Sequence, residues 1–459
     1  MRIYLYFINL LLLAGCVSIK QTSSLSTLPS VLPKNNLFSL ESDNNLSEHK
    51  ISFKSLNLDE GLYGFIDLTL HKNPGWITKL SKLEEVKSGL NFLTNGAKPN
   101  LNSSVGWTSG KENTRDSDFK TSKIPQFQSN VGFAWELDMW GKWEAHRNET
   151  HEILKAEHFM LKSAKLALIY EASKLWYMYK FLSEDRQLVY DQIQNHHDYH
   201  ILHLHKYNAG LDDNESIIKM ENQIRQLVLE HNRVDKELSI CAVKIGYLTG
   251  KPLDHNLSNT GFISKDQIYS LPAVLPTKYI EQRPDVMEIK ARLTAHDFHT
   301  FASKLDLYPS LQLRLSGIGM SGDLSNPFKQ WKIAGGPSFN IPILDPQRKT
   351  QLKFDLKKMD TLKNQWIETI IRSVMEIESA AINHNATMDD LKIVKILDSE
   401  NKKLLAISSD RFKHGLISKI EYLQKENEFL DVRRRTILAE RNNIFSFLDL
   451  TKSLGINWN

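Results

Sequence analysis

Four short stretches of the chain alternate between apolar and polar residues, a pattern typical of β-strands with one apolar and one polar face. They cover residues 101–107, 131–137, 311–316 and 331–341. With the residues that flank these alternating positions, each predicted strand has about 8 to 11 residues, close to the length of a tilted transmembrane strand. Large loops, over residues 109–125 and 318–330, would join the strands of each half into a hairpin.

Two long stretches, residues 142–209 and 347–414, contain neither glycine nor proline and therefore predict long helices. Each has 68 residues. A helix of this length would extend for about 100 Å. A single glycine follows each stretch, and after it comes a shorter stretch without either residue, which predicts a helix that returns along the long one. The glycines are Gly210 and Gly415, and the return stretches are residues 211–245 and 416–454.

The return helices are too short to cover the long ones, so a further helix in each half is needed. Residues 74–95 and 284–305 each begin with proline, which suits the first turn of a helix. One short and one return helix together match the long helix in length. The first return helix also carries a heptad seam typical of lateral helix packing, in which we interpret His231 as a tolerated polar residue. The seam consists of Ile224, Leu227, His231, Val234, Leu238, Cys241, Ile245 and Leu248.

The same order of elements occurs twice, at an offset of 205 residues. The segment from Tyr207 to Leu211 matches the segment from Phe412 to Leu416, and Gly250 and Gly455 keep the same offset. Such self-similarity indicates an internal duplication.

Four amphipathic strands cannot close a membrane barrel on their own, and their open edges cannot be left bare in lipid. The smallest membrane barrels have about 8 strands. Two or three chains would therefore have to pool their strands. Three chains would give 12 strands, together with a ring of long helix pairs about 100 Å in length.

Composition and charge exclude several classes of protein. The 459 residues are 41% hydrophobic, and a net charge of +4 gives no concentrated basic surface for nucleic acid. No apolar run reaches the roughly 18 residues of a membrane-spanning helix. We find no Ser/His/Asp constellation, Cys/His metal box or P-loop, and expect no enzyme and no cofactor. The segment from Gly317 to Gly322 fits G-x-G-x-x-G, but residues typical of a loop follow it, so we interpret it as a flexible extracellular hairpin.

At the amino terminus, an apolar stretch from Ile3 to Leu13 precedes Ala14, Gly15 and Cys16. This segment resembles the lipobox of bacterial lipoproteins. This predicts a signal peptide over residues 1–15 and a lipid-modified Cys16; the alternative is an ordinary signal peptide that happens to end near a cysteine. Val17 stands where an inner-membrane retention signal would have Asp, so the resemblance implies the outer membrane.

Taken together, the chain resembles the TolC-like outer-membrane factor family, and within it the lipid-anchored efflux (NodT/OprM-like) branch. The motifs that carry the resemblance are Cys16, Asn73-Pro74, Phe133–Lys142, Gln282–Val286, Tyr308–Leu311, Asn340–Asp345 and Gly415. The resemblance implies a homotrimer with a 12-stranded β-barrel and a long α-helical barrel in the periplasm. It also implies two partners, a periplasmic adaptor and an inner-membrane pump of the RND type, and passive export of small molecules.

We expect five segments along the chain. They are the signal peptide 1–15, a lipid-anchored tether and equatorial segment 16–72, a first repeat 73–250, a linker or equatorial segment 251–282, and a second repeat 283–459. The alternatives for function are an exit duct for type I protein secretion, an exit duct for metal ions, and a non-conducting coiled-coil scaffold lipoprotein.

The resemblance also implies roles for residues at the two glycine turns, which would dock the adaptor at the periplasmic tip. They are Tyr207, Gly210, Leu211, Phe412, Gly415 and Leu416. Alternatively, these are helix turns without a docking role. Glu421 falls where the family often has an acidic gate residue, although an exposed helical glutamate is the other interpretation. Two departures are Gln424, which is acidic in some relatives, and Pro346-Gln347, where the family usually has Gly-Gly.

A cluster of histidines precedes the first turn. His196, His200 and His203 share one helical face and could place imidazoles on Zn²⁺ or Cu²⁺. The competing interpretation is a solvated helical face, and we predict no metal site with these residues as the weak candidates.

Overall fold

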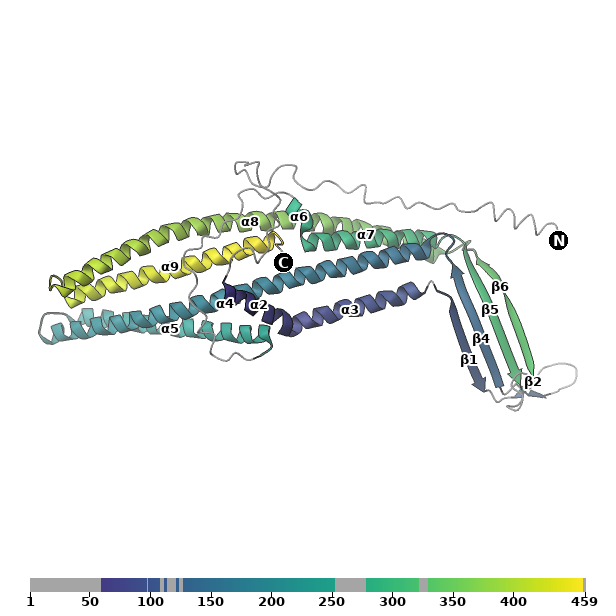
Figure 1. The fold of residues 1–459 in the computed structure, drawn as a ribbon, viewed down its shortest axis with the longest axis horizontal. Helices are drawn as coiled ribbons and strands as arrows, with labels where there is room; N and C mark the ends of the chain where they lie inside the picture. The colour runs from purple at the N-terminus through teal and green to yellow at the C-terminus, as the bar shows by residue number, and fades with distance from the viewer. Residues whose placement is uncertain are drawn as a thin grey trace. The chain divides into compact units, whose positions relative to one another are not determined.

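The computed structural model describes residues 59–96, 98–107, 111–113, 121–123, 127–251, 278–321 and 329–456 (Figure 1). The predicted signal peptide, Cys16 and most of the 251–282 linker lie outside these residues. The helices are α2 (Glu60–Lys72), α3 (Pro74–Asn95), α4 (Lys142–Asn208), α5 (Asn214–Thr249), α6 (Lys278–Gln282), α7 (Pro284–Leu305), α8 (Pro346–Lys413) and α9 (Lys419–Ser453). The strands are β1 (Asn100–Trp107), β2 (Lys111–Asn113), β3 (Thr121–Lys123), β4 (Phe127–Leu137), β5 (Ser310–Ser321) and β6 (Gln330–Asn340).

These elements form two compact units. The sheet unit contains the described parts of Lys82–His158 and Met287–Glu368, and the helical unit contains those of Val31–Ser81, Phe159–Val286 and Thr369–Asn459. Both long helices pass from one unit into the other.

The sheet unit contains an antiparallel sheet in the order β1-β4-β5-β6 (Figure 1). Its register places odd-numbered residues opposite odd-numbered ones throughout; for example, Phe133 pairs with Leu101 and with Leu315. Because side chains alternate along a strand, all the odd residues share one face of the sheet. The four predicted strands are confirmed, and their apolar sides make one common face.

Two details of the predicted hairpins are wrong. β5 extends to Ser321, so Gly317 and Gly319 lie in a strand that is paired on both sides, rather than in a flexible hairpin. Ladder hydrogen bonds to β4 and β6 hold these glycines in place, although glycine lowers the intrinsic strand preference. A small hairpin of β2 and β3 also lies within the predicted 109–125 loop.

The two short helices begin and end where the sequence predicted, and the long helices agree to within one residue. The return helices begin later than predicted because polar side chains cap them. Asp213 accepts a hydrogen bond of 2.8 Å from the Ser216 backbone N–H, and Ser418 accepts one of 3.1 Å from that of Glu421.

The residue before each helix-opening proline holds the end of a return helix. Asn73 donates from its side chain to the carbonyl of Leu248 at 3.2 Å. Arg283 donates to the carbonyl of Ser453 at 2.8 Å. Leu248 and Ser453 are themselves 205 residues apart. The two halves therefore repeat a contact as well as an order of elements.

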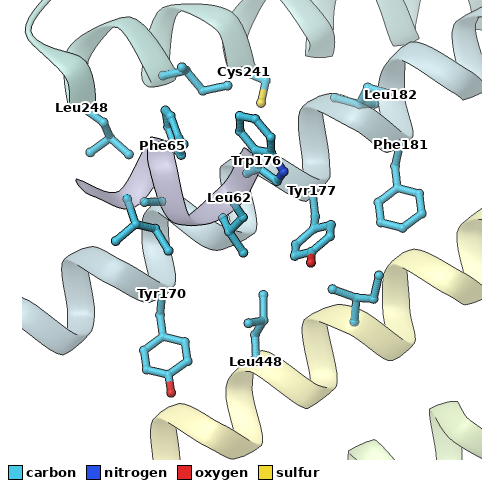
Figure 2. Close-up of a cluster of buried hydrophobic side chains, with 14 of the residues drawn as sticks. Leu62, Phe65, Tyr170, Trp176, Tyr177, Phe181, Leu182, Cys241, Leu248 and Leu448 are labelled. Carbon is cyan, nitrogen blue, oxygen red and sulfur yellow. The ribbon is translucent and has the colours of Figure 1, made fainter. Parts of the chain in front are cut away.

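The helical unit is built around a core to which four helices contribute (Figure 2). Phe65 of α2 stacks on Trp176 of α4, with ring centroids 5.3 Å apart. Cys241 of α5 and Leu448 of α9 are buried in the same cluster, and Cys241 forms no disulfide. Burying a large apolar side chain contributes about 1.5–3 kcal/mol. The predicted seam is confirmed, since Leu227 and His231 are half-buried and its other members are buried.

Helix α2 lies within the segment that the sequence assigned to a tether and equatorial region. Asp59 caps it by accepting a hydrogen bond of 3.0 Å from the Gly61 N–H, and also pairs with Lys180 of α4. Burial alone would raise the pKa of Asp59, but Lys180 and the Gly61 N–H bring it below its ordinary value. Through Asp59, the first described residues are joined to the long helix.

Candidate functional site

The even-numbered face of the sheet is mainly polar, with Ile318 and Met320 of β5 as its large apolar residues. Asn102, Asn130, Gln312 and Ser316 lie on it, together with small residues such as Ala134 and Gly336. Its charged residues in the described strands are Glu136, Arg314 and Lys332. Such a face can contact water and polar solutes.

The odd-numbered face is apolar and exposed. Leu101 is 73% exposed and Trp331 is 70% exposed. Aromatic residues lie near both ends of the strands on this face, as in the interfacial girdles of membrane barrels. At one end are Trp107, Phe127 and Trp331, and at the other are Trp135 and Phe339. An apolar surface of this kind marks contact with lipid or with another protein.

The outer strands β1 and β6 leave two open edges in the four-stranded sheet. An unpaired edge presents a row of N–H and C=O groups to a further strand. One edge of one chain can therefore pair with the other edge of a second chain.

The junctions between sheet and long helix differ in the two halves. In the first, Gly141 has a φ of 81° before α4 begins. The equivalent position, 205 residues later, is Pro346, the first residue of α8. There Asp345 caps the helix by accepting a hydrogen bond of 3.0 Å from the Arg348 N–H. Where the family usually has Gly-Gly, this chain therefore begins α8 with a proline and a capping aspartate. This start requires no glycine in the left-handed conformation.

The two turns between long and return helices have the same geometry. Gly210 has a φ of 74° and Gly415 a φ of 70°, values that favour glycine. The Leu211 N–H donates to the Lys206 carbonyl and the Leu416 N–H to the Arg411 carbonyl, both at 2.9 Å, as in a Schellman motif. Leu211 is 77% exposed and Leu416 is 73% exposed. Each turn thus presents one leucine to solvent.

The surroundings of the two turns differ chemically. Beside the first, His203 donates a hydrogen bond to Asp212, which lowers the pKa of that carboxyl. Beside the second, Phe412 stacks on Tyr422 at 5.4 Å, and the Lys419 ammonium lies 5.6 Å and 5.1 Å from the two ring centroids. Lys419 is not among the predicted site residues, and the available signal in the sequence was the spacing of Phe412 and Tyr422 around it.

Glu421 is exposed in the first turn of α9. Together with Ser418 it fits the S-x-x-E capping pattern, and a carboxylate at a helix N-terminus is favourable. In the single chain, Glu421 therefore has the position of an exposed glutamate that stabilises the start of a helix.

The three histidines of the candidate metal cluster lie on α4, but their neighbours differ. His203 is paired with Asp212, and the Nε2 of His200 is 3.9 Å from a carboxylate oxygen of Glu221. Burial lowers the pKa of His196, with Asp431 acting in the opposite direction. Within the described residues, no three His, Cys, Asp or Glu side chains are arranged to hold a metal ion.

Charged side chains tie the helices of the helical unit together. Arg434 of α9 donates to Asp185 of α4 at 2.7 Å and to Glu230 of α5 at 3.0 Å. Hydrogen bonds from Arg233 and Arg434 lower the pKa of Glu230 to about 2. Arg433, Arg434 and Arg435 are consecutive and therefore point to different sides of α9. Arg433 and Arg434 pair with acidic residues of neighbouring helices.

None of the described helices combines the length and apolarity needed to cross a membrane. In the part of the chain covered by the structure, the polar and apolar strand faces, the open sheet edges and the two turns are surfaces available to other molecules.

Residues 275–456 match the family model of outer membrane efflux proteins. The chain is similar to the toluene efflux pump outer membrane protein TtgC of Pseudomonas putida, with 19% identity over 72% of this chain and 70% of the relative. It is also similar to the probable outer membrane lipoprotein SilC of Salmonella typhimurium, with 23% identity over 98% and 95% of the two chains. The solved structure of CusC, described as forming a transmembrane channel, covers 93% of this chain and 97% of its own, with a TM-score of 0.78 and 16% identity.

Proposed function

We propose that the protein is the outer-membrane exit duct of a multi-component efflux pump. The proposal rests on two findings: residues 275–456 match the family model of outer membrane efflux proteins, and the described chain has the fold of TolC-like channels. The predicted resemblance to the TolC-like family is confirmed. The observation that carries the function is the four-stranded sheet, whose residues separate into one polar and one apolar face. A scaffold without a pore would not need this separation.

In this proposal the assembly is a homotrimer. The open edge of β1 in one chain pairs with the open edge of β6 in the next, and three chains close a 12-stranded barrel. The apolar face then contacts lipid and the polar face lines the bore. Solutes pass through the bore without chemical change, so the protein has no catalytic role.

The partners and the cargo follow from the same premise. TtgC is a component of a toluene efflux pump, which favours small molecules as the cargo here. The exposed leucines at the two turns, with the turn residues Tyr207, Gly210, Phe412 and Gly415, form the docking surface for a periplasmic adaptor, itself bound to an inner-membrane pump. Glu421, close to the second turn, contributes an acidic group to the gate. Cys16 carries the lipid anchor.

The test is planar-bilayer conductance of the purified, acylated protein, combined with chemical crosslinking to count subunits. We expect trimers that conduct. Monomers that never conduct would contradict the proposal and favour the scaffold. Metabolic labelling with a radioactive fatty acid tests the anchor separately, since Cys16→Ser should lose the label while the purified protein still forms conducting trimers.

A further inference from the structure

Arg314 lies in the middle of β5 on the polar face of the sheet, in a gap between small neighbours. Its register partners are Ala134 on β4 and Gly336 on β6. Neither side chain is large enough to cover a guanidinium, and Arg314 is exposed. β5 is an inner strand, paired along both sides, so the register fixes the face from which Arg314 projects.

No described neighbour neutralises the charge of Arg314. Its Nη2 donates to the Gln312 side-chain oxygen at 2.6 Å, and its Nε donates to the same atom at 3.2 Å. This partner is a neutral amide. Among the described residues, neither Arg314 nor Lys332 forms an ion pair. The remaining charged residue of this face, Glu136, lies 4.0 Å from Lys142 at the end of the sheet.

We propose that Arg314, assisted by Lys332, forms a ring of positive charge in the bore that selects for anions and for anionic small molecules. This inference rests on the proposed trimeric duct, in which each chain contributes one Arg314 at the same level. Guanidinium groups bind carboxylates and phosphates well, and they remain charged at every physiological pH. The ring therefore acts as a permanent filter.

The dimensions of the barrel decide whether such a ring can affect a passing solute. Twelve strands spaced about 4.8 Å apart and tilted by about 40° give a radius of roughly 12 Å. Arginine projects inward from this wall, so its charge lies within about 10 Å of the axis, which is the Debye length at 0.1 M salt. Three such charges would change the ratio of anion to cation permeability by about twofold at 0.1 M. At 1 M salt the Debye length is only about 3 Å, and the effect should disappear.

The experiment measures reversal potentials of the purified trimer across a KCl gradient, once with concentrations near 0.1 M and once near 1 M. We expect Arg314→Gln to shift the permeability ratio toward cations by about twofold at the lower concentration and not at the higher. Arg314→Lys keeps the charge and should behave as the wild type does. Lys332→Gln should shift the ratio in the same direction as Arg314→Gln, by a smaller amount.

The outcomes separate this inference from the proposed function. A wild-type protein that neither trimerises nor conducts would contradict the duct itself. A conducting Arg314→Gln trimer with the wild-type reversal potential at 0.1 M would overturn the charge ring and leave the duct intact. If Arg314→Gln fails to assemble, as judged by crosslinking, Lys332→Gln on the edge strand provides the deciding measurement, and an unchanged ratio there would overturn the ring.

Discussion

The Nδ1 of His299, on α7, lies 2.9 Å from a carboxylate oxygen of Glu149, on α4. The other oxygen of Glu149 accepts a hydrogen bond of 3.0 Å from His146. On its far side, the Nε2 of His299 is 3.7 Å from a carboxylate oxygen of Asp355, on α8. A protonated His299 therefore joins residues of three helices close to the positions where they meet the sheet.

The charges in this cluster favour one arrangement of protons. The hydrogen bond to Glu149 raises the pKa of His299 above its ordinary value, against the effects of burial and of Lys358. Burial would raise the pKa of Glu149, but His146 and His299 lower it to about 2. His296, which stacks on His299, has its pKa lowered by burial, and its Nε2 donates to the Asp355 carbonyl. The surroundings thus favour the charged form of His299 and the neutral form of His296 beside it.

The first prediction is that this cluster makes the stability of the sheet unit depend on pH. The pKa of His299 is raised in the folded state, so its contribution is complete below 6.5 and is lost as the pH rises through the folded value. The pKa of Glu149 is lowered, so its contribution is complete above 4.5 and is lost as the pH falls toward about 2. We expect His299→Gln to lower the melting temperature most between pH 4.5 and 6.5, and progressively less toward pH 9.

Thermal unfolding in detergent, followed at several pH values, tests this prediction. His151→Gln is the matched control, because His151 is an exposed histidine of α4 that lies 3.7 Å from Glu152. It should lower the melting temperature little at any pH. A deficit of His299→Gln that stays constant from pH 5 to pH 9 would show that the imidazole acts only through packing.

The second prediction concerns Arg434, which links three helices of the helical unit. Arg434→Ala would leave Asp185, a residue only 6% exposed, without its cation. Breaking a buried pair in this way costs about 3–5 kcal/mol. We expect chemical denaturation to show a loss near the lower end of that range, since Glu230 retains Arg233 as a partner. Arg225→Ala, at an exposed helical ion pair, should cost less than about 1 kcal/mol.

A double variant distinguishes charge from packing at the same position. Arg434→Met with Asp185→Leu removes both charges and should recover much of the stability lost in Arg434→Ala. Equal losses in Arg434→Ala and Arg225→Ala would show that the pair between α9 and α4 contributes little.

The elements that the sequence predicted are those whose signals are local. Proline at positions 74 and 284 fixes the starts of two helices, and an uninterrupted helical stretch predicts α4 from its own composition. The alternation around Leu315 likewise reveals a strand without knowledge of its neighbours. These features depend on residues that lie close together in the chain.

What the sequence did not reveal depends on residues far apart in the chain. Glu149 and His299 are 150 residues apart, and no spacing rule connects them. Arg434 points toward α4 only because α9 packs there, which a run of three arginines does not specify. Gly317 and Gly319 were interpreted as part of a flexible hairpin because residues typical of a loop follow them, whereas pairing on both sides holds them in β5. In each case the arrangement depends on tertiary contacts and not on the local sequence.

The third prediction tests which face of the sheet contacts lipid. Leu315, on the apolar face, and Ser316, on the polar face, are adjacent in the middle of β5. A lysine on the lipid side near the bilayer centre costs about 2–4 kcal/mol. We therefore expect Leu315→Lys to reduce folding into liposomes strongly. Ser316→Lys introduces the same charge one residue away and should change the folding free energy by about 0.5 kcal/mol or less. The reverse order would place the polar face against lipid.

The last prediction concerns the exposed leucines of the two turns. Leu211 and Leu416 occupy equivalent positions in turns of the same geometry, and each is fixed through its backbone N–H, so the side chain is free for a partner. A large apolar side chain left in water, in a turn held by a left-handed glycine, suits contact with an apolar surface of the proposed adaptor. We expect Leu211→Asp and Leu416→Asp each to reduce site-specific crosslinking to the adaptor, and the double variant to abolish it, because a carboxylate would have to be buried in the interface.

Asn208→Asp is the control for this prediction. It adds the same charge in the last turn of α4 without removing an apolar group, and should retain crosslinking. Since neither leucine is buried, the two single leucine variants and the double variant should melt within a few degrees of the wild type. Unchanged crosslinking in the folded double variant would mean that the turns are only helix connections and that the adaptor binds elsewhere.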